Sequence, residues 1–352
     1  MGQSQLASIV TPAYNAEDFI EDALRSCFNQ VYRPLEMIIV NDGSTDSTIE
    51  RVNRFADSIS DSRFELRIMN VGENKGAANA LNLGFSKAEG DYICWLSADD
   101  IFTDREKIGR QVECMNKTGA SWSYYRDVYL GENRHNATLA RSSYLHTFRV
   151  LDPLFLRSSD LRLMSVLFKN PINGSSTMIR KECIEKYGQF DSATKNVDPD
   201  GDLWMRYSAL GLKLAALNGA PVFYREHATQ TSKRSYLMLR GCELTRMRIL
   251  LTLEKKGILN KLVAKFAPFL PVIFETKYHF ERPLVTEFLL NYISAHKNEL
   301  APLRIVPLRR YLRAVKNHRN YRTIDSEEFH RDLKSLCRSS EYRAFESAFL
   351  KQ

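Results

Sequence analysis

The sequence predicts an α/β fold in which helices cover both faces of a largely parallel sheet. Short apolar strands alternate with stretches of helical periodicity over residues 7–98, a pattern typical of consecutive strand–helix–strand units. A polar segment follows each of these strands. The composition, 44% hydrophobic and 26% charged over 352 residues, is that of an ordinary globular protein, neither disordered nor fibrous.

The elements of the N-terminal part are expected in a regular order. Strands are predicted over residues 7–11, 35–40 and 64–69, and a fourth begins at Tyr92. Helical patterns begin at Ala16, near Ser47 and near Lys75, and the Ser and Thr residues of N-D-G-S-T-D-S-T are suited to cap the second helix. The fourth strand runs into two adjacent carboxylates, Asp99 and Asp100, whose charges repel each other.

The later part of the chain is less regular. Residues 121–170 are expected to be irregular and aromatic-rich, followed by a short strand at 177–180 and a helix at 181–187. A turn-rich loop then becomes helical at about Asp202, and the chain beyond Tyr236 is predicted to be helical almost to its end, with breaks at prolines.

The charge is unevenly distributed along the chain, and the cysteine content argues against a disulfide-rich or zinc-binding protein. The net charge is +8, and the excess of basic residues lies at the C-terminal end, where residues 233–352 carry 24 Lys and Arg against 12 Asp and Glu. Six scattered cysteines without a C-x-x-C pair indicate reduced thiols rather than a disulfide framework or a zinc site. Neither a signal peptide nor an apolar run of about 18 residues is found, so a cytoplasmic location is expected.

Four polar segments are expected at one edge of the sheet, because ligands of such sheets bind beyond the carboxyl ends of the strands. They are residues 11–15, 41–46, 70–76 and 97–100. Four polar segments at one edge of the sheet indicate a ligand-binding site more specifically than any one of these segments does.

The order of the motifs resembles that of the family 2 glycosyltransferases. The motifs are T-P-A-Y-N, N-D-G-S-T-D, N-K-G-A-A-N-A, L-S-A-D-D and D-P-D-G-D-L-W-M-R, and they cover roughly residues 7–230. The resemblance implies an inverting enzyme with the GT-A fold, a Rossmann-like, mostly parallel mixed sheet flanked by helices. It implies a catalytic domain over 1–235, with a nucleotide-sugar half (1–115) and an acceptor half (116–235), followed by a basic helical C-terminal extension over 236–352.

The resemblance assigns the donor site to the first three motifs. Thr11, Pro12, Ala13, Tyr14 and Asn15 are expected to line the nucleotide base and ribose. Asp42 is expected to accept a hydrogen bond from a uracil-type imide N–H beside Gly43, and Lys75, Gly76 and Asn79 to lie near phosphate or ribose. A plain structural turn at 41–44 and a solvated surface lysine remain the alternatives.

The resemblance also assigns a metal and a base. Asp99 matches the second, metal-contacting carboxylate of the D-x-D signature, with Ser97 in place of the first carboxylate and Ala98 between them. A bound Mg²⁺ or Mn²⁺ would offset the charge of Asp99 and Asp100, and His227 is a candidate further ligand, with a structural role as its alternative.

The acceptor base is assigned to Asp200, with Asp198 as the alternative. Pro199 stands where the family carries Glu. Asp202 is expected to cap a helix and to pair with Arg206.

The predicted function is the transfer of a sugar to a hydroxyl group of a saccharide or lipid-linked saccharide. A UDP-sugar is the expected donor. The Q/R-x-x-R-W motif of processive relatives is missing, so one or few sugars are added per encounter. A catalytically silent sugar-nucleotide-binding protein and a nucleotidyltransferase are the alternatives. The basic tail, with the apolar segment 257–274 and the basic residues that continue to Lys316, is expected either to pack on the catalytic core or to lie on an anionic membrane surface. No nucleic-acid partner is expected.

Overall fold

The computed structural model describes most of the chain, and the described residues form two compact units. The first unit contains residues 1–142, 172–196 and 213–230, and the second contains residues 143–171, 197–212 and 231–352. This division differs from the single boundary expected near residue 235, since two internal segments belong to the second unit. The described residues are 5–141, 149–168, 170–194, 198–228, 230, 235–266, 283–296 and 326–352.

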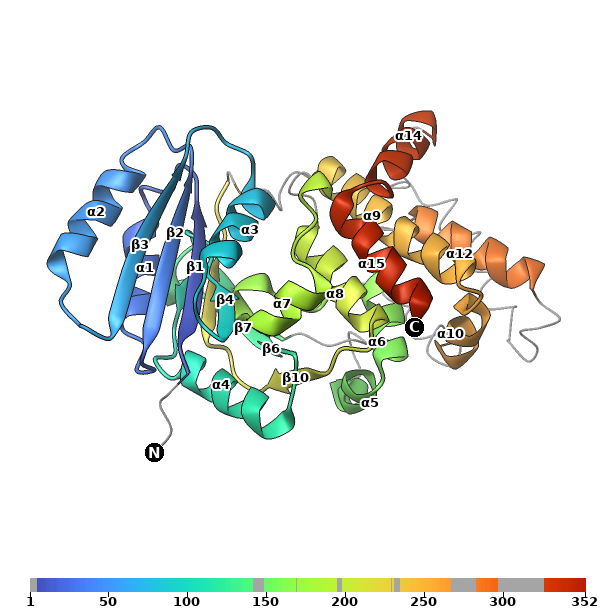
Figure 1. Ribbon diagram of the computed structural model, residues 1–352, viewed down its shortest axis with the longest axis horizontal. Coiled ribbons are helices and arrows are strands. Elements are labelled where there is room, and N and C mark those ends of the chain that lie inside the picture. The colour runs from blue at the N-terminus through green and yellow to red at the C-terminus, as the bar shows by residue number, and fades with distance from the viewer. Residues whose placement is uncertain are drawn as a thin grey trace. The chain divides into compact units, whose positions relative to one another are not determined.

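A seven-stranded sheet forms the centre of the first unit, with the order β10-β6-β9-β4-β1-β2-β3 (Figure 1). All neighbouring strands are parallel except at β9, which is antiparallel to both β4 and β6. The α/β fold with a mostly parallel mixed sheet is thus confirmed. The strands are β1 (Ala7–Ala13), β2 (Leu35–Asp42), β3 (Phe64–Val71), β4 (Tyr92–Trp95), β6 (Trp122–Tyr125), β9 (Thr177–Arg180) and β10 (Leu214–Leu217).

The central strands of this sheet are buried throughout because helices cover both of its faces. Every residue of β2 is buried, which explains its continuous apolar run rather than an alternating one. Helix α3 packs on β1 and β2, whereas α1 packs with α2 (Figure 1). The helices of this unit are α1 (Ile20–Phe28), α2 (Thr48–Ser58), α3 (Ala77–Lys87), α4 (Lys107–Thr118) and α7 (Lys181–Tyr187).

A second, four-stranded sheet belongs to the same unit, with the order β5-β11-β7-β8. Its strands are β5 (Ile101–Phe102), β11 (Val222–Arg225), β7 (Asp127–Gly131) and β8 (Thr138–Arg141). The expectation of irregular structure over 121–170 is therefore wrong. The aromatic run W-S-Y-Y is a strand buried on both faces, and such strands show no alternation.

The second unit is helical, and the described residues beyond 235 form helices as predicted. Its long helix α9 contacts α8, α10, α12 and α14. Helix α8 begins at Pro199, three residues before the predicted start, because proline fits the first helical turn. The helices are α5 (Asp152–Arg157), α6 (Ser159–Phe168), α8 (Pro199–Ala209), α9 (Ser235–Lys255), α10 (Leu259–Phe266), α12 (Pro283–Ala295), α14 (Ser326–Leu336) and α15 (Ser340–Lys351).

The described part of the tail packs its apolar side chains inward. In α10, Leu259, Leu262, Val263 and Phe266 are buried, and Lys265 pairs with Asp160 at 2.7 Å. Among the described helices, none combines the length and the apolar character that a membrane crossing requires. Residues 267–274 of the candidate membrane-surface segment lie outside the described residues, as do Arg304, Arg309, Arg310, Arg313 and Lys316.

The first unit buries one lysine completely. Lys107, at the start of α4, is 0% exposed, and its ammonium nitrogen lies 4.3 Å from the ring centroid of Phe102. This nitrogen has no hydrogen-bond partner among the described residues. Burial lowers the pKa of Lys107.

Lys107→Met is therefore expected to stabilise the protein by about 1–3 kcal/mol at pH 7, since it removes an unsatisfied buried polar group. The unfolded chain binds the lysine proton more tightly, so wild-type stability rises with pH between the folded and the unfolded pKa of Lys107, and the variant loses this rise. Urea unfolding at pH 7 and 9 measures both effects. A variant less stable than wild type at both pH values would contradict the prediction.

Candidate functional site

The loops after β1 and β2 are bound to each other at the carboxyl edge of the sheet. The Asn15 side-chain oxygen accepts a hydrogen bond from the Thr45 N–H at 2.9 Å, and the Asn15 N–H donates to the Ser44 hydroxyl at 3.1 Å. Asn15 adopts a positive φ of 48°, a conformation that asparagine tolerates. The two predicted segments thus form one continuous polar surface.

Asp42 connects this surface to the loop after β3. Its two carboxylate oxygens accept hydrogen bonds from the backbone N–H groups of Lys75 (2.9 Å) and Gly76 (2.7 Å), and the residue is 3% exposed. In the structure this carboxylate holds the loop after β3 against the end of β2. The expected hydrogen bond from the N–H of a nucleotide base to Asp42 stays a prediction.

Gly43 makes this docking sterically feasible. Its φ is +77°, and a Cβ atom at this position would lie 2.9 Å from the backbone nitrogen of Asn74. Any side chain would separate the loop after β2 from the loop after β3.

The loop after β3 presents a cation beside the start of α3. The Lys75 side chain is half exposed, and its ammonium lies 3.6 Å from the Glu73 carboxylate. The Asn79 amide donates to the Lys75 carbonyl at 2.6 Å, so the predicted trio of Lys75, Gly76 and Asn79 forms one helix start. The exposed ammonium of Lys75 beside the start of α3 suits a phosphate.

The loop after β1 presents an aromatic ring. Tyr14 is 50% exposed, whereas Ala13 and Thr11 are buried and Pro12 is partly exposed. The Thr11 hydroxyl has no hydrogen-bond partner among the described residues. An exposed ring at a sheet edge is a stacking surface for a planar base.

Asp99 and Asp100 face different surroundings although they are adjacent. Asp100 is buried, and its carboxylate accepts from the Ser175 hydroxyl (2.6 Å) and the Arg225 N–H (3.2 Å). Burial and the neighbouring charge of Asp99 raise the pKa of Asp100 well above its ordinary value. The Ser175 hydroxyl and the Arg225 N–H thus supply hydrogen bonds to Asp100, and the cation expected beside the two carboxylates stays a prediction.

Asp99 is the accessible member of the pair and lies beside His227. Asp99 Oδ2 and His227 Nε2 are 2.9 Å apart, and their side chains are 27% and 21% exposed. The His227 ring also packs on Phe19, with 4.9 Å between centroids. Ala98 is buried, and the Ser97 N–H donates to the Ser175 hydroxyl at 3.3 Å.

These two side chains fit a divalent cation. They are hydrogen-bond partners in this structure, and carboxylate oxygen and imidazole nitrogen are both ligands of divalent transition-metal ions. No cluster of three or more His, Cys, Asp or Glu residues suited to a metal occurs in the described parts of the chain. Mg²⁺ takes most of its ligands from substrate phosphates and water, so two protein ligands suffice.

Asp200 lies in the second unit, on the first turn of α8. It is partly exposed, its carboxylate accepts the Gly201 N–H at 2.9 Å, and the Asn170 amide lies 3.5 Å away. Burial, followed by the charge of Asp198, raises the pKa of Asp200 to about 7. A carboxylate with this pKa is suited to general base catalysis near neutral pH.

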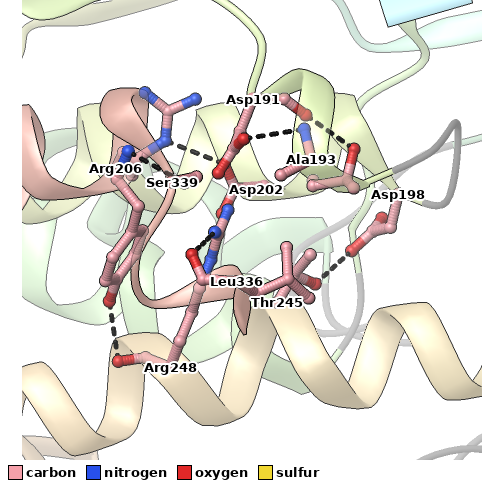
Figure 2. A network of polar contacts seen from close by, with 12 residues as sticks. Asp191, Ala193, Asp198, Asp202, Arg206, Thr245, Arg248, Leu336 and Ser339 are labelled. Atoms are coloured by element: carbon pink, nitrogen blue, oxygen red, sulfur yellow. Dashed lines mark hydrogen bonds and ion pairs between the residues drawn. The ribbon is translucent and has the colours of Figure 1, made fainter. Parts of the chain in front are cut away.

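Asp202 belongs to a buried ion cluster. The predicted pair with Arg206 is present at 2.8 Å, and Arg248 Nη2 contacts the other oxygen at 2.5 Å (Figure 2). The predicted capping role of Asp202 is wrong, because the helix starts earlier and Asp198 occupies the N-cap position. All three side chains of the cluster are 0% exposed.

Sequence reasoning missed two groups of residues. Ser175 and Arg225 lie beside Asp100 in the first unit, and Thr245, Arg246 and Arg248 lie beside Asp198 and Asp202 in the second. Arg225 stands two residues before His227, and its N–H and guanidinium hold Asp100 and the Asp99 carbonyl. Ser175 belongs to the N-G-S-S segment directly before β9, and no motif of the sequence marks this segment. No local pattern pairs α9 with aspartates about 46 residues earlier.

Comparison with known proteins identifies the family. The sequence profile of glycosyl transferase family 2 matches residues 8–185, about half of the chain. The chain belongs to glycosyl transferase family 2. This match confirms the family resemblance and covers the first four motifs, whereas Asp198, Asp200, Asp202 and His227 lie beyond residue 185. The role of each site residue stays a prediction.

Relatives and solved structures agree with this membership. An uncharacterized glycosyltransferase of Haemophilus influenzae is 29% identical over 66% of this chain and 69% of that protein. A putative teichuronic acid biosynthesis glycosyltransferase, TuaG of Bacillus subtilis, is 35% identical over 34% of this chain and 45% of that protein. The crystal structure of S. aureus TarS in complex with UDP-GlcNAc superposes with a TM-score of 0.60 at 16% identity, covering 98% of this chain and 91% of that one.

The TarS match supports the GT-A fold of this family 2 member. The chain spans 42%, 69% and 59% of the length of three curated relatives that it matches.

Proposed function

We propose that this family 2 member transfers a sugar from a UDP-sugar to a hydroxyl group of a saccharide or lipid-linked saccharide, with inversion and one or few sugars at a time. The observation that carries the proposal is the polar carboxyl edge of the sheet, where Asp42 ends β2 and Tyr14, Lys75 and Asp99 follow the neighbouring strands β1, β3 and β4. This is where a doubly wound sheet binds a nucleotide.

The donor end of the reaction uses residues of the first unit. Tyr14 stacks on the base, Asn15 and Asp42 shape the ribose and base surface, and Lys75 attracts the diphosphate. Asp99 and His227 would hold Mg²⁺ or Mn²⁺, which supplies charge stabilisation for the leaving diphosphate. Asp100, fixed by Ser175 and Arg225, keeps the backbone at Asp99 in place.

The acceptor end uses one carboxylate. An inverting transfer needs a single base to take the proton of the attacking hydroxyl, and no covalent intermediate forms. Asp200 supports this assignment through its partial exposure and its pKa of about 7. Asp198, the alternative base, is committed to Arg246 and Thr245.

The acceptor class is proposed from the relatives. TuaG is named for teichuronic acid biosynthesis, which favours a role in polysaccharide assembly at the cell envelope. A cytoplasmic place of action and peripheral contact with a membrane through the basic C-terminal region belong to the same proposal.

A panel of nucleotide sugars, tested by thermal shift with and without Mn²⁺, examines the donor proposal. A ligand that binds only the folded state raises the melting temperature. We expect UDP and UDP-GlcNAc to give metal-dependent shifts, and GDP-mannose to give a smaller one. A silent binding protein would show the shift without releasing UDP. A nucleotidyltransferase would respond to a nucleoside triphosphate with a sugar phosphate, and this outcome would refute the proposal.

Asp99→Ala is expected to weaken Mn²⁺-dependent binding of UDP-GlcNAc at least 10- to 100-fold, the range seen when metal sites lose even an outer partner. Calorimetric titration with Mn²⁺ and with EDTA separates the metal-dependent part. Asp57→Ala, which removes an exposed carboxylate of α2, is the matched control and should bind like wild type. Equal affinity of Asp99→Ala and the control would exclude Asp99 as a metal ligand.

A further inference from the structure

Three aspartates alternate at the start of α8, and the two outer ones contact arginines. Asp202 contacts Arg206 and Arg248, and Asp198 contacts Arg246. Asp198 also accepts a hydrogen bond from the Thr245 hydroxyl at 3.1 Å (Figure 2). Among the described residues, no arginine lies within ion-pair distance of Asp200, whose contacts are Asn170 and the Gly201 N–H.

The local backbone brings the Asp198 carboxylate against Gly201, the residue after Asp200. Asp198 has a φ of 54°, in the left-handed region, and its carboxylate folds over Gly201. A Cβ atom on residue 201 would lie 2.2 Å from Asp198 Oδ1, so only glycine leaves room for this arrangement. Arg246, which is 0% exposed, holds the carboxylate there from α9.

We propose that Arg246, acting through Asp198, is a positioning residue for Asp200. Arg246 neutralises Asp198 and fixes the first turn of α8, so that Asp200 is the carboxylate of the three that remains available to an acceptor. This inference rests on the proposed role of Asp200 as base. It adds a residue from α9, outside the matched family segment, to the catalytic machinery.

The charges around Asp200 predict the direction in which its pKa moves when one of them is removed. Among the described residues, the charged groups of this cluster are Asp198 at the N-cap of α8, Asp202 and Arg206 on α8, and Glu243, Arg246 and Arg248 on α9. After burial, the charge of Asp198 raises the pKa of Asp200, whereas Arg246 lowers it. Loss of Arg246 should therefore move this pKa upward, and loss of the Asp198 charge should move it downward.

The test measures the pH dependence of UDP release from UDP-GlcNAc with Mn²⁺. In Arg246→Met, the inflection should move up by about one pH unit, and in Asp198→Asn down by about one unit. Arg246→Lys, which keeps the charge, should stay near wild type. Arg240→Met is the matched control, because Arg240 lies on the same helix but pairs with Glu328 and Asp332.

Arg246→Met leaves a buried carboxylate unpaired and can fail to fold. The double variant Asp198→Asn, Arg246→Met removes both charges, and its inflection should lie below that of wild type. Folded variants whose inflections coincide with wild type would overturn the inference and leave the cluster a purely structural one.

A second measurement needs no substrate. The free energy of unfolding is measured from pH 4 to 9 for each variant, with and without the additional substitution Asp200→Asn. The difference between the two members of each pair reports proton binding by Asp200. If the pKa of Asp200 moves as predicted but no UDP is released, the proposed function fails and the charge coupling stands. If UDP is released and this pKa does not move, the inference alone fails.

Discussion

Asp200→Asn is expected to bind donor like wild type and to lose sugar transfer by roughly 10²- to 10⁴-fold, the usual contribution of a general base. The asparagine side chain has nearly the same shape but cannot accept the acceptor proton. Transfer is measured as UDP release in the presence of a saccharide acceptor, and donor binding by calorimetry. Asp57→Asn controls for loss of an exposed carboxylate. Full turnover of Asp200→Asn would refute the assignment of the base.

The same substitution should stabilise the protein at high pH. The pKa of Asp200 is raised from 3.8 to about 7 on folding, so the folded state binds the proton more tightly, and wild-type stability falls as pH rises through this window. Asp200→Asn removes this loss and should gain about 2–4 kcal/mol at pH 8, with a much smaller gain at pH 4. Urea unfolding at the two pH values checks the sign. A gain that does not depend on pH would mean that the carboxylate keeps its ordinary pKa.

Asp202→Ala carries the second large effect, a loss of about 3–5 kcal/mol of unfolding free energy. The substitution leaves the buried guanidinium groups of Arg206 and Arg248 without their carboxylate. Burial alone would raise the pKa of Asp202, but the charges of Arg248 and Arg206 outweigh it and lower the pKa. The stability that Asp202 contributes is therefore present at neutral pH and is lost only as pH falls through its folded pKa.

Urea unfolding at pH 7 measures this loss. Asp332→Ala, which removes an exposed partner of Arg240, is the matched control and should cost no more than about 1 kcal/mol. A similar loss in both variants would show that the cluster around Asp202 is not a major source of stability.

The sheet and its polar edge could be predicted because their signals are local. Each polar segment directly follows an apolar run, so the runs over 7–11, 35–40 and 64–69 also predict where the polar residues lie. The observed strands extend two residues further, to Ala13, Asp42 and Val71. The Asp202–Arg206 pair was also predictable, since residues four apart share a helix face.

The contacts that were missed join residues distant in sequence. Asp42 binds backbone N–H groups 33 and 34 residues away, and His227 reaches Asp99 over 128 residues. Composition carries no information on such pairs. Likewise, residues 121–170 were expected to be irregular because a strand buried on both faces, such as β6, lacks the alternation that marks a strand.

The most direct test of the account is UDP release from the UDP-sugar that gives the largest thermal shift, measured for wild type, Asp99→Ala and Asp200→Asn with Mn²⁺ and with EDTA. We expect release by wild type with Mn²⁺ only, and nearly none by either variant. Release that is independent of metal and equal in all three proteins would contradict the account.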